Sequence, residues 1–121
     1  MEELKLCESD HRFMQLIWEH EPVTSRRLVE LAGEAFGWKK STTYTVLKKL
    51  CERNFAQNED SVVTALIPRQ EVQRFESRRV VERDFAGSLP GFLVSFFGDR
   101  KITQQEAEEL TALIQKHREE G

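Results

Sequence analysis

Residues 37–54, GWKKSTTYTVLKKLCERN, combine hydroxyl side chains with cationic ones. Threonine and serine hydroxyls can donate to or accept from base edges and phosphates, and a threonine methyl can touch a thymine methyl. Lysine and arginine neutralise phosphates and orient a protein on a duplex. The segment therefore has two interpretations, a surface that binds double-stranded DNA or an ordinary solvated helix face.

The charge of the chain is unevenly distributed. Residues 24–53 carry seven basic and three acidic side chains, residues 1–23 carry two and six, and residues 54–121 carry nine and twelve. The net charge is thus +4 in the central block, in a chain whose total is −3. Phosphate neutralisation depends on the charge near the contact, so an acidic chain can still carry a duplex-facing surface.

Composition and motifs exclude several classes of protein. The 121 residues, 39% hydrophobic and 32% charged, fit one globular domain with or without an appendage. No P-loop, nucleophile-elbow, dinucleotide-binding or HExxH motif occurs, which argues against an enzyme. The three histidines and two cysteines lack metal-ligand spacing, so we expect free thiols, no metal and no cofactor. No stretch of bilayer length and no signal peptide occurs, so the expected compartment is the cytoplasm.

The first part of the chain is expected to form three helices. Helical spacing of apolar residues predicts the first over 10–20, capped by Ser9. Thr24 is the natural N-cap of a second over 25–36, and Gly37 ends it. The side chains expected to face inward from the second helix are Leu28, Leu31, Ala32 and Ala35.

The third helix is predicted from about Ser41 to Arg53, with Asn54 closing it. Steps of 100° place Thr43, Val46, Leu47 and Leu50 on one core-facing arc and the hydroxyl and basic residues opposite. We expect DNA to be bound by residues of this helix, of the segment just before it and of the second helix. These residues are Arg26, Arg27, Lys39, Lys40, Ser41, Thr42, Tyr44, Thr45, Lys48 and Lys49.

These candidates divide by chemistry. Ser41, Thr42 and Thr45 are expected to reach base edges or phosphates, while the lysines and the two arginines neutralise phosphates. Tyr44 either reaches the DNA backbone or packs, half-buried, beside the second helix. We expect Trp38 to have a packing or positioning role.

A short hairpin is predicted next. The β-prone runs 55–57 and 62–67 flank a turn at 58–61, and Pro68 stops the second run. Three helices followed by a hairpin is the order of a winged helix, whose third helix enters the major groove. The expected fold is therefore mainly α with a small β-hairpin wing: a winged helix-turn-helix domain over 1–68 and a helical dimerisation region over 69–121.

Helices are predicted over 69–86, 89–97 and 104–120, the last with a capping box of Thr103 and Glu106. Five of the eight phenylalanines lie in this part of the chain, which is too thin to bury them. A second copy of the chain would cover them, and packing back on the chain's own winged helix is the alternative. The expected interface residues are Phe75, Val80, Phe85, Leu89, Phe92, Leu93, Phe96, Phe97, Leu110 and Ile114.

The segments FMQLIWEHEPVTSRRLVELA and WKKSTTYTVLKKL, followed by the tail, form ordered motifs along nearly the whole chain. These motifs resemble the penicillinase repressor family of transcriptional regulators. The first segment is similar to the family's first two helices, and the second is similar to its third. Thr43 occupies a slot that is aliphatic in the family. The tail, with Gly87-Ser88 before the fifth helix and an acidic EEL on the last, is similar to the family's dimerisation helices.

The resemblance implies a homodimeric repressor that binds a palindromic operator, with no small-molecule substrate. It also implies relief when a membrane sensor protease causes cleavage in the fifth helix. The family's asparagine-phenylalanine cleavage bond corresponds to Ser95-Phe96 here. The chain lacks the paired C-x-C motifs of the family's copper-responsive members.

The wing differs from the family pattern. Ser61, Val62 and Leu66 stand where the family has glycine-arginine and an aromatic residue, so a basic wing contact to phosphate is not expected. This wing and the overall acidity favour an alternative, a winged helix that binds protein and not DNA. A weaker alternative is a redox-tuned regulator that uses Cys51.

Overall fold

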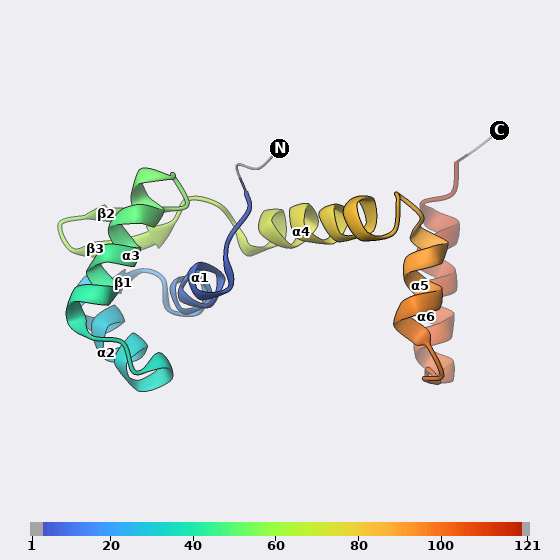
Figure 1. The fold of residues 1–121 in the computed structure, drawn as a ribbon, viewed down its shortest axis with the longest axis horizontal. Helices are drawn as coiled ribbons and strands as arrows, with labels where there is room; N and C mark the ends of the chain where they lie inside the picture. The colour runs from blue at the N-terminus through green and yellow to red at the C-terminus, as the bar shows by residue number, and fades with distance from the viewer. Residues whose placement is uncertain (1–3, 120–121) are drawn as a thin grey trace. The chain divides into compact units, whose positions relative to one another are not determined.

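The structure is a computed structural model, which describes residues 4–119. It has six helices and three short strands among these residues, so the expected fold class, mainly α with a small antiparallel sheet, is confirmed. Contacts divide the chain into an N-terminal unit that ends at Val80 and a C-terminal unit that begins at Val81. Figure 1 shows the elements in order: α1 (Glu8–His20), β1 (Val23–Thr24), α2 (Ser25–Phe36), α3 (Lys40–Glu52), β2 (Ala56–Glu59), β3 (Val62–Ala65), α4 (Arg69–Asp84), α5 (Leu89–Phe97) and α6 (Gln104–Lys116).

Local signals set the ends of α2 and α3. The Thr24 hydroxyl accepts a hydrogen bond of 3.0 Å from the backbone N–H of Arg27 and so caps α2 as predicted. Gly37 ends α2 with a φ of 71°, a left-handed conformation that glycine adopts at little cost. After α3, Asn54 adopts the left-handed conformation with a φ of 63°, also as predicted.

Several predicted details were wrong. Helix α1 begins at Glu8 with Cys7 as its N-cap, because its polar first turn precedes the apolar pattern. Ala35 is exposed, whereas its neighbour Phe36 packs against the core at the end of α2. Helix α4 ends at Asp84, because Ala86 and Gly87 have positive φ values that break the helix. Helix α6 ends at Lys116, and its predicted end at residue 120 falls outside the described residues.

The sheet has the order β1-β3-β2, and β1 was not predicted. It consists of Val23 and Thr24, which pair with Val63 and Val62. The hairpin turn holds only Asp60 and Ser61, both with positive φ as in type I′ turns, so β2 extends to Glu59. A two-residue strand whose partner lies far along the chain has no periodicity of its own from which to predict it.

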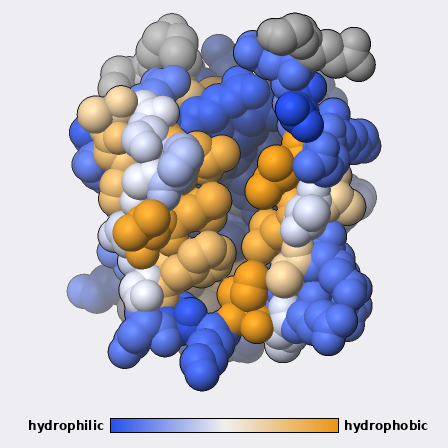
Figure 2. All heavy atoms as spheres, turned by 90° about the vertical axis from the view of Figure 1, so that its right-hand side faces the viewer, coloured by the Kyte–Doolittle hydropathy of each residue, from blue (hydrophilic) through white to orange (hydrophobic). Residues whose placement is uncertain are grey.

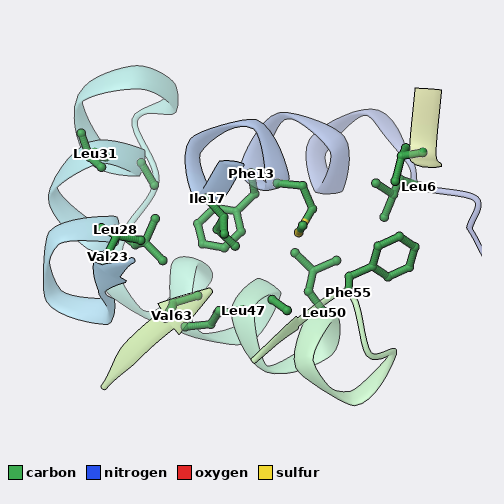
Figure 3. Packing of buried hydrophobic residues seen from close by; sticks show 14 residues of the cluster. Leu6, Phe13, Ile17, Val23, Leu28, Leu31, Leu47, Leu50, Phe55 and Val63 are labelled. Atoms are coloured by element: carbon green, nitrogen blue, oxygen red, sulfur yellow. The ribbon is translucent and has the colours of Figure 1, made fainter. Parts of the chain in front are cut away.

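One core joins α1, α2, α3 and the sheet. Figure 3 shows Phe13, Ile17, Leu28, Leu50 and Val63 pointing toward one another from these elements, and all five are fully buried. Burial of each such side chain contributes roughly 1.5–3 kcal/mol. The predicted core arc of α3 is confirmed for the three residues that the structure buries: Thr43, Leu47 and Leu50.

The first turns of α4 belong to the N-terminal unit. Val72 is fully buried in its core. The indole of Trp18 donates a hydrogen bond of 2.9 Å to the carbonyl of Ile67, just before α4. The Arg69 guanidinium lies 5.5 Å from the centre of the Trp18 ring and 3.9 Å from the Glu19 carboxylate. These contacts attach the start of α4 to the winged helix.

The C-terminal unit contains α5 and α6, which lie side by side in Figure 1. The hydroxyl of Ser88 accepts from the N–H of Gly91 at 2.9 Å, and that of Thr103 accepts from the N–H of Glu106 at 3.0 Å. These caps fix the starts of both helices, yet neither helix buries any residue. Among the residues described, none of the helices has the length and apolar character needed to cross a bilayer.

Candidate DNA-binding surface

The outer arc of α3 is polar and exposed. Ser41, Thr42, Thr45 and Lys48 are exposed on this arc, opposite the buried Thr43, Leu47 and Leu50. Tyr44 lies at the same surface with 37% of its area exposed. One 13-residue helix therefore holds the core with one face and presents hydroxyl and cationic groups with the other.

The threonine hydroxyls are not equivalent. The Thr45 hydroxyl donates a hydrogen bond of 2.9 Å to the carbonyl of Ser41 within α3. Its proton is therefore engaged, and an outside group meets its methyl and an oxygen lone pair. The Thr42 hydroxyl has no hydrogen bond to any residue that the structure describes, so it can both donate and accept. Thr45 is thus suited to a thymine methyl and Thr42 to a polar base edge.

The N-terminal end of α3 favours an anion. Its N-cap, Lys39, makes no side-chain capping bond, and the first turn contains no acidic residue. The uncapped N–H groups and the helix dipole attract negative charge, as do the exposed Lys39 and Lys40. A phosphate oxygen would satisfy these donors.

The residues expected on α2 and before α3 are also placed. Arg26 is exposed, and Arg27 forms a half-exposed ion pair of 3.4 Å with Glu30. Such a pair contributes little to stability and leaves Arg27 available for a stronger anion. Trp38 stacks on Phe13 with ring centres 5.7 Å apart, so it packs against the core.

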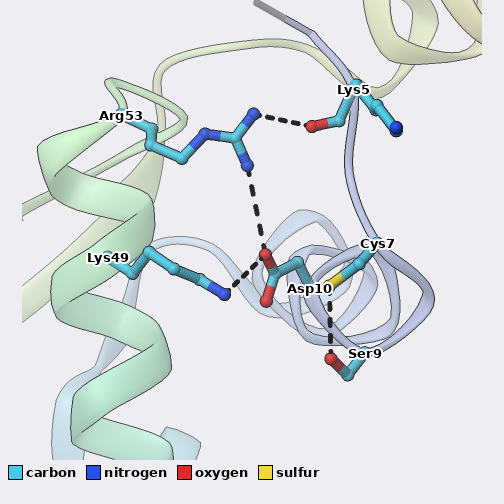
Figure 4. Close-up of polar contacts among 6 residues, drawn as sticks. All are labelled: Lys5, Cys7, Ser9, Asp10, Lys49 and Arg53. Atoms are coloured by element: carbon cyan, nitrogen blue, oxygen red, sulfur yellow. Dashed lines mark hydrogen bonds and ion pairs between the residues drawn. The ribbon is translucent and has the colours of Figure 1, made fainter.

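Lys49 has an intramolecular partner that the sequence did not indicate. Its ammonium lies 2.9 Å from Oδ2 of Asp10 on α1. Arg53 approaches the same oxygen at 4.0 Å and donates a hydrogen bond of 2.6 Å to the carbonyl of Lys5. Figure 4 shows the Asp10 carboxylate between these two cations, which both come from the end of α3.

Asp10 was not among the predicted site residues, although the sequence contains a signal for it. It precedes Phe13, Met14 and Ile17 at helical spacing, so it continues their apolar stripe on α1. A carboxylate on a buried face requires a cationic or hydrogen-bonding partner. The identity of that partner depends on how α1 packs on α3.

The wing carries no positive charge. No lysine or arginine occurs in residues 54–68, and Glu59 and Asp60 lie at the end of the hairpin. Val62 and Leu66 are 41% and 44% exposed. Like charge would keep this hairpin from phosphates, so the wing adds no cation to those of α2, of α3 and of the segment just before α3.

Cys51 does not have the features of a redox sensor. Burial raises the pKa of the Cys51 thiol above its ordinary value. The thiolate is the reactive form, and a raised pKa keeps the thiol protonated at neutral pH. The structure thus gives no support to a regulator that uses this cysteine.

An apolar groove lies on the C-terminal unit. It runs between α5 and α6 and is lined by Phe92, Leu93, Phe96, Phe97, Ile102 and Leu110, with Glu106 and Glu109 among the lining residues. Figure 2 shows apolar side chains gathered along this hollow between hydrophilic margins. Phe96 is 56% exposed, and exposed apolar patches of this kind mark interaction sites.

The other expected interface residues surround this groove or lie on α4. The Phe85 ring meets that of Phe92 edge-on, with centres 5.4 Å apart. Leu89 and Ile114 are exposed on α5 and α6. Phe75 and Val80 are half-buried on the part of α4 that belongs to the N-terminal unit.

The Ser95-Phe96 bond lies inside α5. Both residues are exposed, but the bond is part of a regular helix that ends at Phe97. A protease binds its substrate in an extended form, so α5 would have to unwind before this bond could be cut.

Two comparisons with known proteins cover most of the chain. The family described as penicillinase repressor matches residues 6–116. The penicillinase repressor of Bacillus licheniformis is 18% identical over 118 residues, which cover 94% of this chain and 92% of that protein. The chain therefore belongs to the penicillinase repressor family, a family of transcriptional regulators and not of enzymes.

Proposed function

We propose that the chain is a homodimeric, sequence-specific repressor that inserts α3 into the major groove of a palindromic operator. The observation that carries the proposal is the outer arc of α3. It presents hydroxyl and cationic side chains from residues 39–49, and this segment contains no acidic residue. A recognition helix needs both kinds of group, because base edges are read by hydrogen bonds and phosphates by charge.

Each group has an assigned contact. Ser41, Thr42 and Thr45 contact base edges, and Tyr44 reaches the DNA backbone. The phosphate contacts come from Arg26, Arg27, Lys39, Lys40 and Lys48. Lys49 is left out of this set because its ammonium is already paired with Asp10.

The apolar groove between α5 and α6 forms the dimer contact. A second copy that packs on Phe92, Phe96 and Leu110 would cover apolar surface that neither helix buries alone. A dimer brings two copies of α3 to one operator, and linking two half-site contacts raises affinity far above that of either.

Relief by proteolysis forms the second part of the proposal. Cleavage at Ser95-Phe96, following a signal from a membrane sensor protease, would divide α5 within the dimer contact. The two chains of the dimer would then separate on the operator, because each winged helix would keep only the contacts to its own half-site.

One observation favours a different function, that of a protein-interaction module. The wing is acidic at its end and exposes Val62 and Leu66, features that suit a basic protein surface better than DNA. This candidate predicts that the chain does not bind duplex DNA at all.

An electrophoretic mobility shift assay distinguishes the two functions. The full chain is mixed with the DNA upstream of its own gene and, separately, with an unrelated duplex of equal length. A repressor retards the upstream DNA at lower protein concentration than the unrelated DNA. Retardation of neither duplex would leave the protein-interaction module as the function.

The role of Lys48 gives a quantitative test. Lys48→Ala is expected to weaken binding to all sequences and to reduce the slope of log affinity against log salt by about 0.9, the value for one phosphate contact. Lys116→Ala, which removes an exposed cation from α6, is the matched control and should leave the slope unchanged. A wild-type slope in Lys48→Ala would remove this residue from the phosphate contacts.

A further inference from the structure

We infer that Asp10 is a positioning residue of the DNA-binding surface: it holds Lys49 against α1 and so limits the number of cations that α3 offers to phosphate. The inference rests on the proposed function and concerns a residue on a different helix. It turns on three residues, Asp10, Lys49 and the neighbouring Lys48.

The Asp10 carboxylate is buried at the junction of α1 and α3. Its side chain is 3% exposed, whereas that of Lys49 is 49% exposed. Lys49 approaches at 2.9 Å and Arg53 at 4.0 Å, both toward Oδ2. No residue that the structure describes donates a hydrogen bond to the other oxygen, Oδ1. The negative charge of the carboxylate is therefore compensated by the cations that approach Oδ2, and Lys49 is the nearer of the two.

A buried carboxylate binds its cationic partner more strongly than an exposed anion does. Removal of the nearest cation would leave the charge in a medium of low dielectric constant, which is strongly unfavourable. A phosphate at the DNA surface stays partly hydrated and screened by counterions. Competition between the two anions thus favours Asp10, and Lys49 stays on α1 when DNA binds.

Lys48 provides the internal comparison. It adjoins Lys49 in sequence and is likewise exposed, but it forms no ion pair with a residue in the described part of the chain. Successive residues on a helix point about 100° apart, so the two lysines diverge toward different partners. Lys48 thus has a role in DNA binding, whereas Lys49 holds α3 to α1.

The test measures the salt dependence of binding to a random-sequence duplex, because the phosphate term is independent of sequence. Asp10→Asn keeps the shape of the side chain and removes its charge. The freed Lys49 is then expected to make one further phosphate contact, which steepens the slope of log affinity against log salt by about 0.9. Loss of a merely structural contact would weaken binding without this steepening.

Three variants complete the experiment. Lys48→Met should reduce the slope, whereas Lys49→Met should leave it at the wild-type value. Asp10→Asn/Lys49→Met, which leaves both positions uncharged, should also bind with the wild-type slope. Circular dichroism checks that each variant is folded. If Asp10→Asn is unfolded, Lys49→Met decides the matter. If Lys49→Met is also unfolded, because it leaves Asp10 without its nearest cation, the double variant decides it: a slope below the wild-type value would overturn the inference.

The possible failures are distinguishable. Wild-type protein that binds no duplex overturns the proposed function and this inference together. Wild-type binding with an unchanged slope in Asp10→Asn, or a reduced slope in Lys49→Met, overturns the inference alone.

Discussion

Thr43 shows how a single hydroxyl is accommodated in the core of the winged helix. It is fully buried among apolar side chains, and its hydroxyl donates a hydrogen bond of 3.3 Å to the carbonyl of Lys39. That carbonyl already accepts the backbone N–H of Thr43 at 3.1 Å. The Thr43 hydroxyl therefore has a hydrogen-bond acceptor within its own helix, and the side chain can serve as a core residue. The Lys39 carbonyl keeps its backbone hydrogen bond whether or not the hydroxyl is present.

Replacement of this hydroxyl should be nearly neutral. Thr43→Val loses a hydrogen bond worth about 1 kcal/mol and buries a methyl group worth about 0.8 kcal/mol. We expect the free energy of unfolding, measured by urea denaturation, to change by less than about 1 kcal/mol. Thr43→Ala is the control and should cost about 1–2 kcal/mol more, because it leaves a cavity. Loss of more than about 2 kcal/mol in Thr43→Val would mean that the hydroxyl itself stabilises the helix.

At the scale of elements, helix boundaries were easier to predict than contacts between helices. Ser88 and Gly98 bracket α5, and the predicted range 89–97 is the observed one, because caps act on their own helix. The strand β1 and the Asp10–Lys49 pair were not predicted, since each joins segments that are far apart in sequence. A helical wheel gives the direction of a side chain from its own axis, but the group that it meets depends on tertiary packing.

The start of α4 depends on one tryptophan. Trp18→Phe removes the hydrogen bond of 2.9 Å to the carbonyl of Ile67 and reduces the ring surface beneath Arg69. We expect it to lower the free energy of unfolding of the N-terminal unit by about 1–3 kcal/mol, because the carbonyl loses its partner.

The second tryptophan gives a matched comparison. Trp38→Phe makes the same change of ring in a residue whose indole donates no hydrogen bond to the residues that the structure describes. Thermal unfolding followed by circular dichroism should therefore show Trp18→Phe as the less stable variant. The assigned role of the Ile67 contact would be refuted by equal stability of the two.

At the scale of the whole molecule, the two units differ in how they bury apolar surface. The N-terminal unit has a core with fully buried residues from α1, α2, α3, the hairpin and α4. In the C-terminal unit, α5 and α6 bury none, and their apolar side chains line an open groove. The second unit is therefore expected to gain much of its stability from association.

A charge placed in the groove should prevent that association. Phe96→Asp is expected to convert a dimer into a monomer in sedimentation velocity, because a desolvated carboxylate would lie within the apolar contact. Val94→Asp is the matched control, since Val94 lies on the same helix, is 74% exposed and does not line the groove. Dimers of equal stability in both variants would exclude the groove as the dimer contact.

The exposed groove also has a consequence for how much of the protein a cell must make. Chains that pair through such a surface do so according to mass action. When the chain concentration lies below the dissociation constant of the dimer, the concentration of dimers rises with the square of the chain concentration. A twofold fall in synthesis would then remove about three quarters of the pairs able to hold both halves of an operator. Gene dosage would thus set the level of repression more steeply than in a regulator that acts as a single chain.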